Sequence, residues 1–193
     1  MSTEITALKD GTAISCSYKG NTVLIAEGVS SEDIYKFKTD VDALISLAPK
    51  GAFEELSLMK KTKPELAIVS KPETGERYSE MKMFSPGRLS FWNDSSARFL
   101  NDGIFEIDIN GTLILYISEK CDIMNIEPRF RKADIAIFDG VSPLDFPKLR
   151  CKTAILREQG SSGGIAEETE VLEYGSLRYC SRGKNIKKGW ISA

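Results

Sequence analysis

Short apolar runs separated by turn residues recur along the chain, and most have the length of a strand. Residues 41–47, VDALISL, form one such run, which breaks at Pro49 and Gly51 before a helix-like segment, AFEELSLMKK, begins at Ala52. A buried strand that ends in a tight turn and opens a helix is typical of α/β folds. We therefore predict that the chain is organised around this strand, turn and helix.

Two stretches have the pattern of a β-hairpin. Residues 11–28 alternate at first and then become mostly apolar, with a turn predicted at Gly20-Asn21. Residues 103–118 repeat the arrangement around Asn110-Gly111, a dipeptide strongly favoured in two-residue turns. Each hairpin is followed by apolar strands with short helices between them, so two similar halves are expected.

The other segments give a coarse prediction of the remaining elements. We expect a short helix in EDIYKF (32–37), strands at 66–69, 88–92, 133–138 and 153–156, a short helix at 123–132, helix or strand at 169–173, and a final pair of edge strands at 177–180 and 189–191. The predicted fold class is α/β, an αββα sandwich in which two mixed sheets pack face to face with helices outside, as one domain over residues 1–193.

Length and composition fit this picture. With 193 residues, 41% hydrophobic and 28% charged, the chain resembles an ordinary globular domain. A net charge of −2 gives no global attraction to nucleic acid or acidic lipid. The first ten residues are polar and acidic, so we expect no signal peptide there, and no apolar run has the length of a membrane span.

The chain contains no histidine. This excludes Ser-His-Asp and Cys-His nucleophile schemes and most mononuclear zinc sites. The four cysteines, which have no C-x-x-C spacing, are expected to be buried free thiols, with a disulfide between Cys151 and Cys180 as the alternative. They are Cys16, Cys121, Cys151 and Cys180.

Carboxylates offer a second route to a metal. Asp122, Asp134 and Asp139 could cluster near strand ends and bind Mg²⁺ or Mn²⁺ through oxygen alone. The preferred interpretation is that Asp122 and Asp139 cap turns and that Asp134 is solvated. The glycine-rich stretch 161–164 lacks the Lys-Ser/Thr of a phosphate-binding loop, so we expect a hairpin tip or linker. Lys50, in the predicted turn before the helix, is expected to be exposed.

Residues 176–193 are basic, with aromatic residues interleaved. Such a segment could follow a nucleic-acid backbone and stack on bases. A solvated sheet edge protected by its charges is the preferred alternative, because the whole chain is slightly acidic. The candidate nucleic-acid-binding residues are Arg178, Arg182, Lys184, Lys187 and Lys188, beside Tyr179 and Trp190.

Several fragments follow the order of one known family. Gly11–Ala13 and Leu24–Gly28 match a Gly-x-Ala strand and the return strand of its hairpin; Val41–Ser46 matches the strand before the family's metal loop, and Ala133–Ile137 a later Ala-Asp-Val-Leu strand. Together they resemble the metallo-β-lactamase fold, and they are most similar to the C-terminal domain of ComEC-type competence proteins, which take up DNA.

The resemblance implies a lost hydrolase site. The family's metal loop falls on Leu47, Pro49, Gly51 and Ala52, none of which can ligate a metal, and only Asp122 falls where the family has a metal-bridging carboxylate. It therefore implies a non-catalytic scaffold or binding module of a ComEC-like protein, without a cofactor. The competing hypothesis is a Mg²⁺- or Mn²⁺-dependent phosphodiesterase or nuclease that uses a carboxylate site around Asp122.

The same resemblance implies the partners. They would be DNA or other parts of a membrane-embedded competence protein, with no membrane insertion by this segment and an extracytoplasmic location. A cytoplasmic interaction domain unrelated to competence is the third hypothesis. The sequence predicts no oligomeric state.

Overall fold

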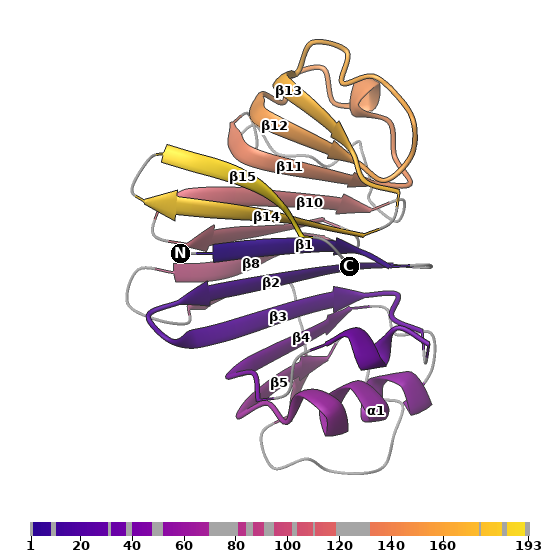
Figure 1. The fold of residues 1–193 in the computed structure, drawn as a ribbon, viewed down its shortest axis with the longest axis vertical. Coiled ribbons are helices and arrows are strands. Elements are labelled where there is room, and N and C mark those ends of the chain that lie inside the picture. The colour runs from indigo at the N-terminus through magenta and orange to yellow at the C-terminus, as the bar shows by residue number, and fades with distance from the viewer. Residues whose placement is uncertain are drawn as a thin grey trace. The chain divides into compact units, whose positions relative to one another are not determined.

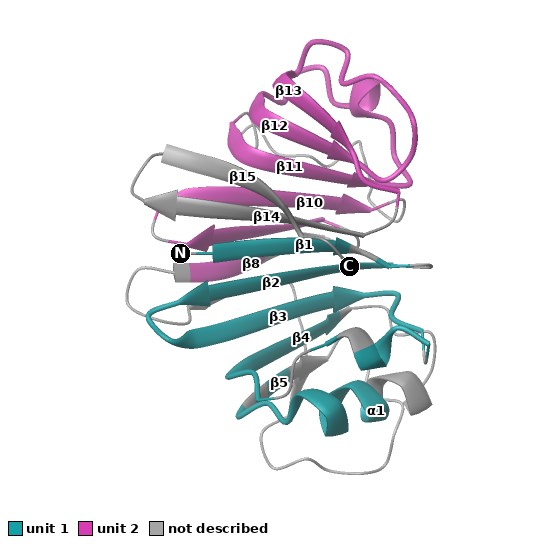
Figure 2. Ribbon diagram, viewed as in Figure 1, with its two compact units in different colours: residues 1–85, 174–193 teal, residues 86–173 magenta. Residues whose placement is uncertain are grey.

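The computed structural model describes residues 2–8, 11–30, 32–37, 40–47, 52–69, 81–83, 87–90, 95–101, 104–109, 111–118, 132–173, 175–182 and 185–191. The chain forms two compact units, and Figure 2 distinguishes them by colour. Unit 1 combines residues 1–85 with residues 174–193, and unit 2 is residues 86–173.

Unit 1 contains a mixed sheet with the strand order β15-β14-β1-β2-β3-β4-β5-β6. Pairings from β15 through β3 are antiparallel, and those from β3 through β6 are parallel. Most of these strands are labelled in Figure 1. Their bounds are β1 Ser2–Ala7, β2 Thr12–Tyr18, β3 Asn21–Glu27, β4 Ala43–Leu47, β5 Leu66–Val69, β6 Met81–Met83, β14 Gly175–Arg182 and β15 Asn185–Ile191.

Unit 2 contains a second mixed sheet, with the order β13-β12-β11-β10-β9-β8-β7. Pairings from β7 through β10 are antiparallel, and those from β10 through β13 are parallel. Each unit thus has an antiparallel half followed by a parallel half, and the prediction of two mixed sheets is confirmed. The bounds are β7 Gly87–Ser90, β8 Ser95–Asn101, β9 Ile104–Ile109, β10 Thr112–Ser118, β11 Ala133–Asp139, β12 Cys151–Leu156 and β13 Ala166–Val171.

Helices are fewer than the predicted sandwich requires. α1 (Ala52–Thr62) follows β4 as expected, and its Leu58 and Met59 are buried in one cluster with Leu44 of β4. It is the one α-helix among the described residues, so outer helical layers are not confirmed. The predicted helix at 123–132 lies outside those residues except for Lys132. No helix in the described part of the chain is long and apolar enough to cross a membrane.

The predicted helix in 32–37 is a single 3₁₀ turn, η1 (Ile34–Lys36). Its N-cap residue, Asp33, makes no capping hydrogen bond; instead the Ser30 hydroxyl donates to the Asp33 carboxylate at 3.2 Å. A helix start without a capping side chain leaves backbone N–H groups unsatisfied, which does not favour further turns. A second 3₁₀ turn, η4 (Pro143–Asp145), is capped by Ser142, whose hydroxyl oxygen accepts from the Leu144 N–H.

The hairpin of unit 2 agrees with its sequence pattern. Phe105, Ile107 and Ile109 of β9 are buried, and the residues between them are only partly buried. Gly111, in the turn, has a φ of +78°, and its N–H donates to the Asp108 carboxylate at 2.9 Å. In unit 1 the turn is at Lys19-Gly20, one residue earlier than predicted, and both residues have positive φ.

Four strand predictions need correction. β1, β6 and β8 were not predicted, because Ser2–Ala7 and Ser95–Asn101 are rich in polar or small residues and Met81–Met83 has only three residues. β14 is not an edge strand, since it pairs with β1 on one side and β15 on the other. The ambiguous segment at 169–173 belongs largely to β13.

The cysteine prediction is partly tested. Cys16 and Cys151 are buried free thiols, and the alternative disulfide between Cys151 and Cys180 is wrong, since β12 and β14 belong to different sheets. Burial raises the pKa of Cys16 to about 12 and, with a smaller effect from Glu167, that of Cys151 to about 11; hydrogen bonds oppose both shifts. Cys121 lies outside the described residues.

Candidate functional site

The carboxyl ends of three parallel strands in unit 2 bring polar side chains together. β10, β11 and β12 are adjacent and run in the same direction, so their carboxyl ends share one edge of the sheet. Asp139 is the last residue of β11, and Arg157 directly follows β12, where its N–H donates to the Phe138 carbonyl at 3.1 Å. Both functional groups are therefore positioned by strand pairing.

Asp139 is held from two sides. The Tyr116 hydroxyl, from β10, donates to its Oδ2 at 2.8 Å, and the Arg157 Nε lies 3.6 Å from its Oδ1. Tyr116 is fully buried and stacks on Phe105, with 4.6 Å between the ring centroids. The three side chains form a polar network on the mostly apolar strands β10, β11 and β12.

The network places a charged pair in a mostly buried position. The Arg157 side chain is 9% exposed and that of Asp139 is 21% exposed. Removing such charges from water is costly, so their mutual attraction and the tyrosine hydrogen bond must offset much of that penalty. Arginine suits this role because its planar guanidinium stays charged and meets carboxylates in a defined geometry.

A hollow of about 310 Å³ lies beside this network. It is bounded by Arg157, by the strand ends at Phe138 and Leu156, and by the loops 140–144 and 158–161. A cavity of this volume is at the small end of the range for small-molecule sites. The network and this hollow are the candidate functional site.

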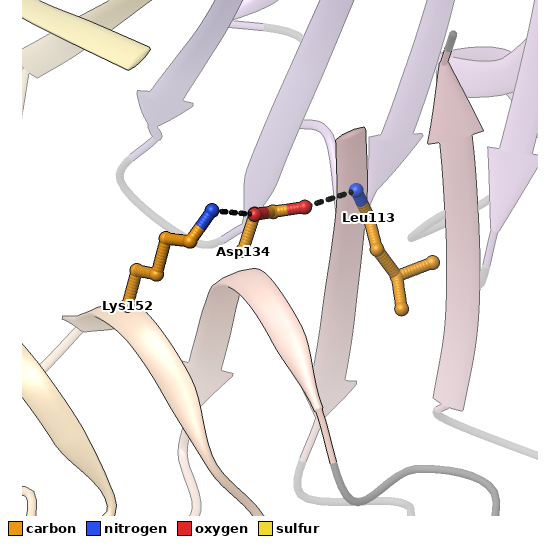
Figure 3. A network of polar contacts seen from close by, with 3 residues as sticks. All are labelled: Leu113, Asp134 and Lys152. Atoms are coloured by element: carbon orange, nitrogen blue, oxygen red, sulfur yellow. Dashed lines mark hydrogen bonds and ion pairs between the residues drawn. The ribbon is translucent and has the colours of Figure 1, made fainter. Parts of the chain in front are cut away.

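Asp134 lies at the opposite end of β11 from Asp139. It accepts from the Leu113 N–H at 2.9 Å and pairs with Lys152, and Figure 3 shows these contacts across three neighbouring strands. Asp139 comes five positions after Asp134 along the strand, a distance on the order of 15 Å. The two cannot share a cation. The expectation that Asp134 is solvated is wrong, since its carboxylate is engaged by Leu113 and Lys152. The expectation that Asp122 and Asp139 cap turns stays a prediction.

A zinc site of the kind the family resemblance implies does not fit the residues present. Leu47 ends β4 and Ala52 begins α1, but neither side chain offers a metal-ligating atom. Outside the described residues lie the other positions that the resemblance singles out, Pro49, Gly51 and Asp122, together with Lys50. Within the described ranges, no three His, Cys, Asp or Glu residues are grouped so that they could hold a metal ion. Asp139 is already engaged by Tyr116 and Arg157.

The basic residues of the C-terminal segment lie on β14 and β15, except Lys184, which is outside the described residues. Cys180 pairs with Lys187, and Tyr179 pairs with Lys188. Arg178 pairs with Gly189, and Arg182 pairs with Asn185. Arg178 also pairs with Glu4 of β1, so an acidic residue lies opposite one of the basic positions in the register.

The glycine-rich stretch 161–164 joins β12 to β13. These strands are parallel, so the stretch is a loop between parallel strands and not the tip of a hairpin. Gly163 and Gly164 both have positive φ, at +60° and +79°. This explains the paired glycines by backbone conformation.

The sequence analysis missed Tyr116 and Arg157. Each has a signal in the sequence: Arg157 is a charged residue directly after an apolar strand, as Asp139 is, and Tyr116 is the one polar side chain within ILYI. Their proximity required the parallel register of β10, β11 and β12, which a single strand pattern does not contain.

Comparisons with known proteins show likeness in fold only. No family model matches the chain, and no curated protein does. A presumed metal-dependent hydrolase from Parabacteroides distasonis has a TM-score of 0.59 at 11% identity, over 88% of this chain and 92% of that one. A presumed zinc-dependent hydrolase of the metallo-β-lactamase superfamily from Thermotoga maritima has a TM-score of 0.44 at 12% identity, over 80% of this chain and 74% of that one. The chain therefore shares the β-rich fold of the Parabacteroides protein.

Proposed function

We propose that this chain is a non-hydrolytic domain with a metallo-β-lactamase-like fold that serves as a scaffold or binding module. The observation that carries the proposal is the state of Asp139, which stands at a strand end and is engaged by Tyr116 and Arg157. The chain also has no histidine with which to build the zinc sites of such hydrolases.

Metal binding tests the proposal directly. Protein purified without chelator is offered zinc or manganese in excess, and bound metal is measured by mass spectrometry. The proposal expects far less than one metal ion per chain. Near-stoichiometric metal would overturn it and would favour the phosphodiesterase or nuclease hypothesis at Asp122.

A matched pair of variants separates a real carboxylate site from adventitious binding. Under the competing hypothesis, Asp122→Ala abolishes both metal binding and any metal-dependent cleavage of DNA or a phosphodiester probe. Asp145→Ala, which removes an exposed carboxylate from η4, serves as the control. If both variants bind the same amount of metal, the metal binding does not depend on Asp122 and is adventitious.

The competence role is the finer part of the proposal, and it rests on the sequence resemblance to ComEC-type proteins. DNA, or other parts of a membrane-embedded uptake protein, would then be the partner. Replacing Arg178, Arg182, Lys184, Lys187 and Lys188 together by glutamine should weaken binding to single-stranded DNA and reduce its salt dependence. Replacing Lys148 and Lys152, basic residues of unit 2, should leave DNA binding unchanged. An equal loss of DNA binding in the two sets of variants would contradict a role for β14 and β15.

A further inference from the structure

We propose that the hollow beside Arg157 binds a small monocarboxylic acid with a compact apolar body. The inference extends the proposed function, since it names a ligand class for a binding domain without a metal. It rests on the position of one buried guanidinium, on the hydroxyl groups near it, and on the apolar walls.

The guanidinium of Arg157 provides the recognition. It lines the hollow and is held in place by Asp139 through Nε, at 3.6 Å. A fixed, planar guanidinium is the side chain best suited to a carboxylate, which it can meet through two parallel N–H donors. Because 91% of the side chain is already removed from water, a ligand would meet it without reordering a long, mobile side chain.

Two serine hydroxyls add donors. Ser142 and Ser161 both line the hollow, and each hydroxyl oxygen accepts a backbone N–H, from Leu144 at 3.3 Å and from Gly163 at 3.2 Å. Since the oxygen in each acts as acceptor, the hydroxyl proton is the group with which each serine can donate to a ligand. An anion binds through hydrogen-bond donors, and these two hydroxyl groups can supply them.

The charge balance favours a monoanion over a phosphate dianion. Asp139 already offsets part of the Arg157 charge, and the hollow is also lined by the exposed acid Glu158. Among the described residues, no lysine or second arginine lines the hollow. A single partly compensated cation can balance one carboxylate, whereas a phosphate group usually requires more positive charge.

The walls define the rest of the ligand. Phe138, Val141, Pro143, Leu144 and Leu156 supply apolar surface. Leu144 is 62% exposed and lies against Gly163, at the place where the two loops meet. A volume of about 310 Å³ accommodates a short branched or single-ring acid and excludes a long acyl chain.

The test uses benzoate and isobutyrate as probes, with benzamide as the neutral match of benzoate and inorganic phosphate as the dianion. Binding to the full chain is followed by chemical-shift changes of the backbone amides at residues 139–142, 144 and 157–161, with chelator present. We expect saturable binding of both carboxylates at millimolar concentration or below. Affinity for benzamide or phosphate should be at least about tenfold weaker.

Variants then assign the site. Arg157→Gln should weaken benzoate binding at least about tenfold. Because this variant leaves Asp139 without its cation and could unfold, Gly160→Leu gives an independent test. Gly160 lines the hollow, and a Cβ there would meet only Leu156 within 4 Å, at an ordinary 3.6 Å. Leucine should fill the hollow and abolish binding, while Gly160→Ala and Lys152→Gln should bind as the parent does.

Different results would overturn the carboxylate recognition, the location of the site and the proposed function. Benzamide or phosphate binding equal to that of benzoate would overturn carboxylate recognition, and full binding by both Arg157→Gln and Gly160→Leu would overturn the site. No binding of either acid, with or without added manganese, would overturn this inference and leave the proposed function intact. Binding that appears only with manganese would overturn both, since the carboxylate would then be held by a metal.

Discussion

Asp42 and Asp134 occupy equivalent positions in the two units. Each accepts a hydrogen bond from the N–H of the second residue of the preceding strand, Thr22 in β3 and Leu113 in β10. Each therefore joins the return strand of a hairpin to the parallel strand that follows it. The two units therefore share one local interaction, in which a carboxylate near the start of a strand fixes the register of the neighbouring strand.

Removing the Asp134 carboxylate should destabilise unit 2. Asp134→Ala leaves the Leu113 N–H without this acceptor, which should lower the free energy of unfolding by about 1–3 kcal/mol. Lys152→Ala is the matched control: the lysine side chain is 52% exposed, so its pair with Asp134 should contribute less than about 1 kcal/mol. Urea unfolding measures both, and an equal loss in the two variants would contradict the role given to the backbone hydrogen bond.

The hydroxyl group of Tyr116 should contribute to the stability of the protein in addition to the stacking of its ring. Tyr116→Phe keeps the stacking on Phe105 but removes the donor to Asp139, and we expect a loss of about 1–2 kcal/mol. Tyr35→Phe should have no effect, because Tyr35 is 83% exposed. If urea unfolding gives the same stability for Tyr116→Phe and the parent, the Asp139 carboxylate does not depend on that hydrogen bond.

Gly11 and Gly20 should respond differently to alanine. A Cβ at Gly11 would overlap the backbone carbonyl of Glu27 and crowd Gly28, so Gly11→Ala should cost about 2 kcal/mol or more. At Gly20 there is open space, and the cost should be about 1 kcal/mol, from its φ of +89° alone. Thermal unfolding of the two variants tests the order; a greater loss at Gly20 would contradict it.

The buried thiol of Cys16 should make stability fall at alkaline pH. Burial raises its pKa from the ordinary 9.0 to about 12 in the folded protein. Between these values the unfolded chain releases the proton and the folded chain keeps it, so unfolding becomes easier by up to about 1.4 kcal/mol per pH unit. Below pH 9 both states keep the proton and no dependence is expected. Cys16→Ala should have a shallower decline between pH 9 and pH 11 than the parent, and identical slopes would exclude this thiol as a cause.

Sequence reasoning succeeded where the determining interactions are local. The turn at Asn110-Gly111 needs positive φ, which glycine adopts readily, and the alternation of Phe105, Ile107 and Ile109 marks the buried face of β9. The strand that ends at Leu47 and the helix that begins at Ala52 follow from an apolar run and two breakers. All of these patterns extend over a few residues.

It failed where pairing between distant segments decides the structure. Ser2–Ala7 is too polar to predict as a strand, yet it lies between β2 and β14, with Ile5 opposite both Ile14 and Leu177. The candidate site could not be assembled for the same reason. Tyr116, Asp139 and Arg157 meet only because β10, β11 and β12 are parallel neighbours, whereas their positions in the sequence span about forty residues.

The position of β1 has a consequence for synthesis on the ribosome. β1 is made before unit 2, and one of its two partners, β14, emerges only after all of residues 86–173 have been translated. Until β14 has been made, the backbone N–H and C=O groups on the edge of β1 that pairs with β14 lack their native hydrogen-bond partners. Unit 2 is continuous in the chain and can close first, so the slow, exposed stage of folding belongs to unit 1.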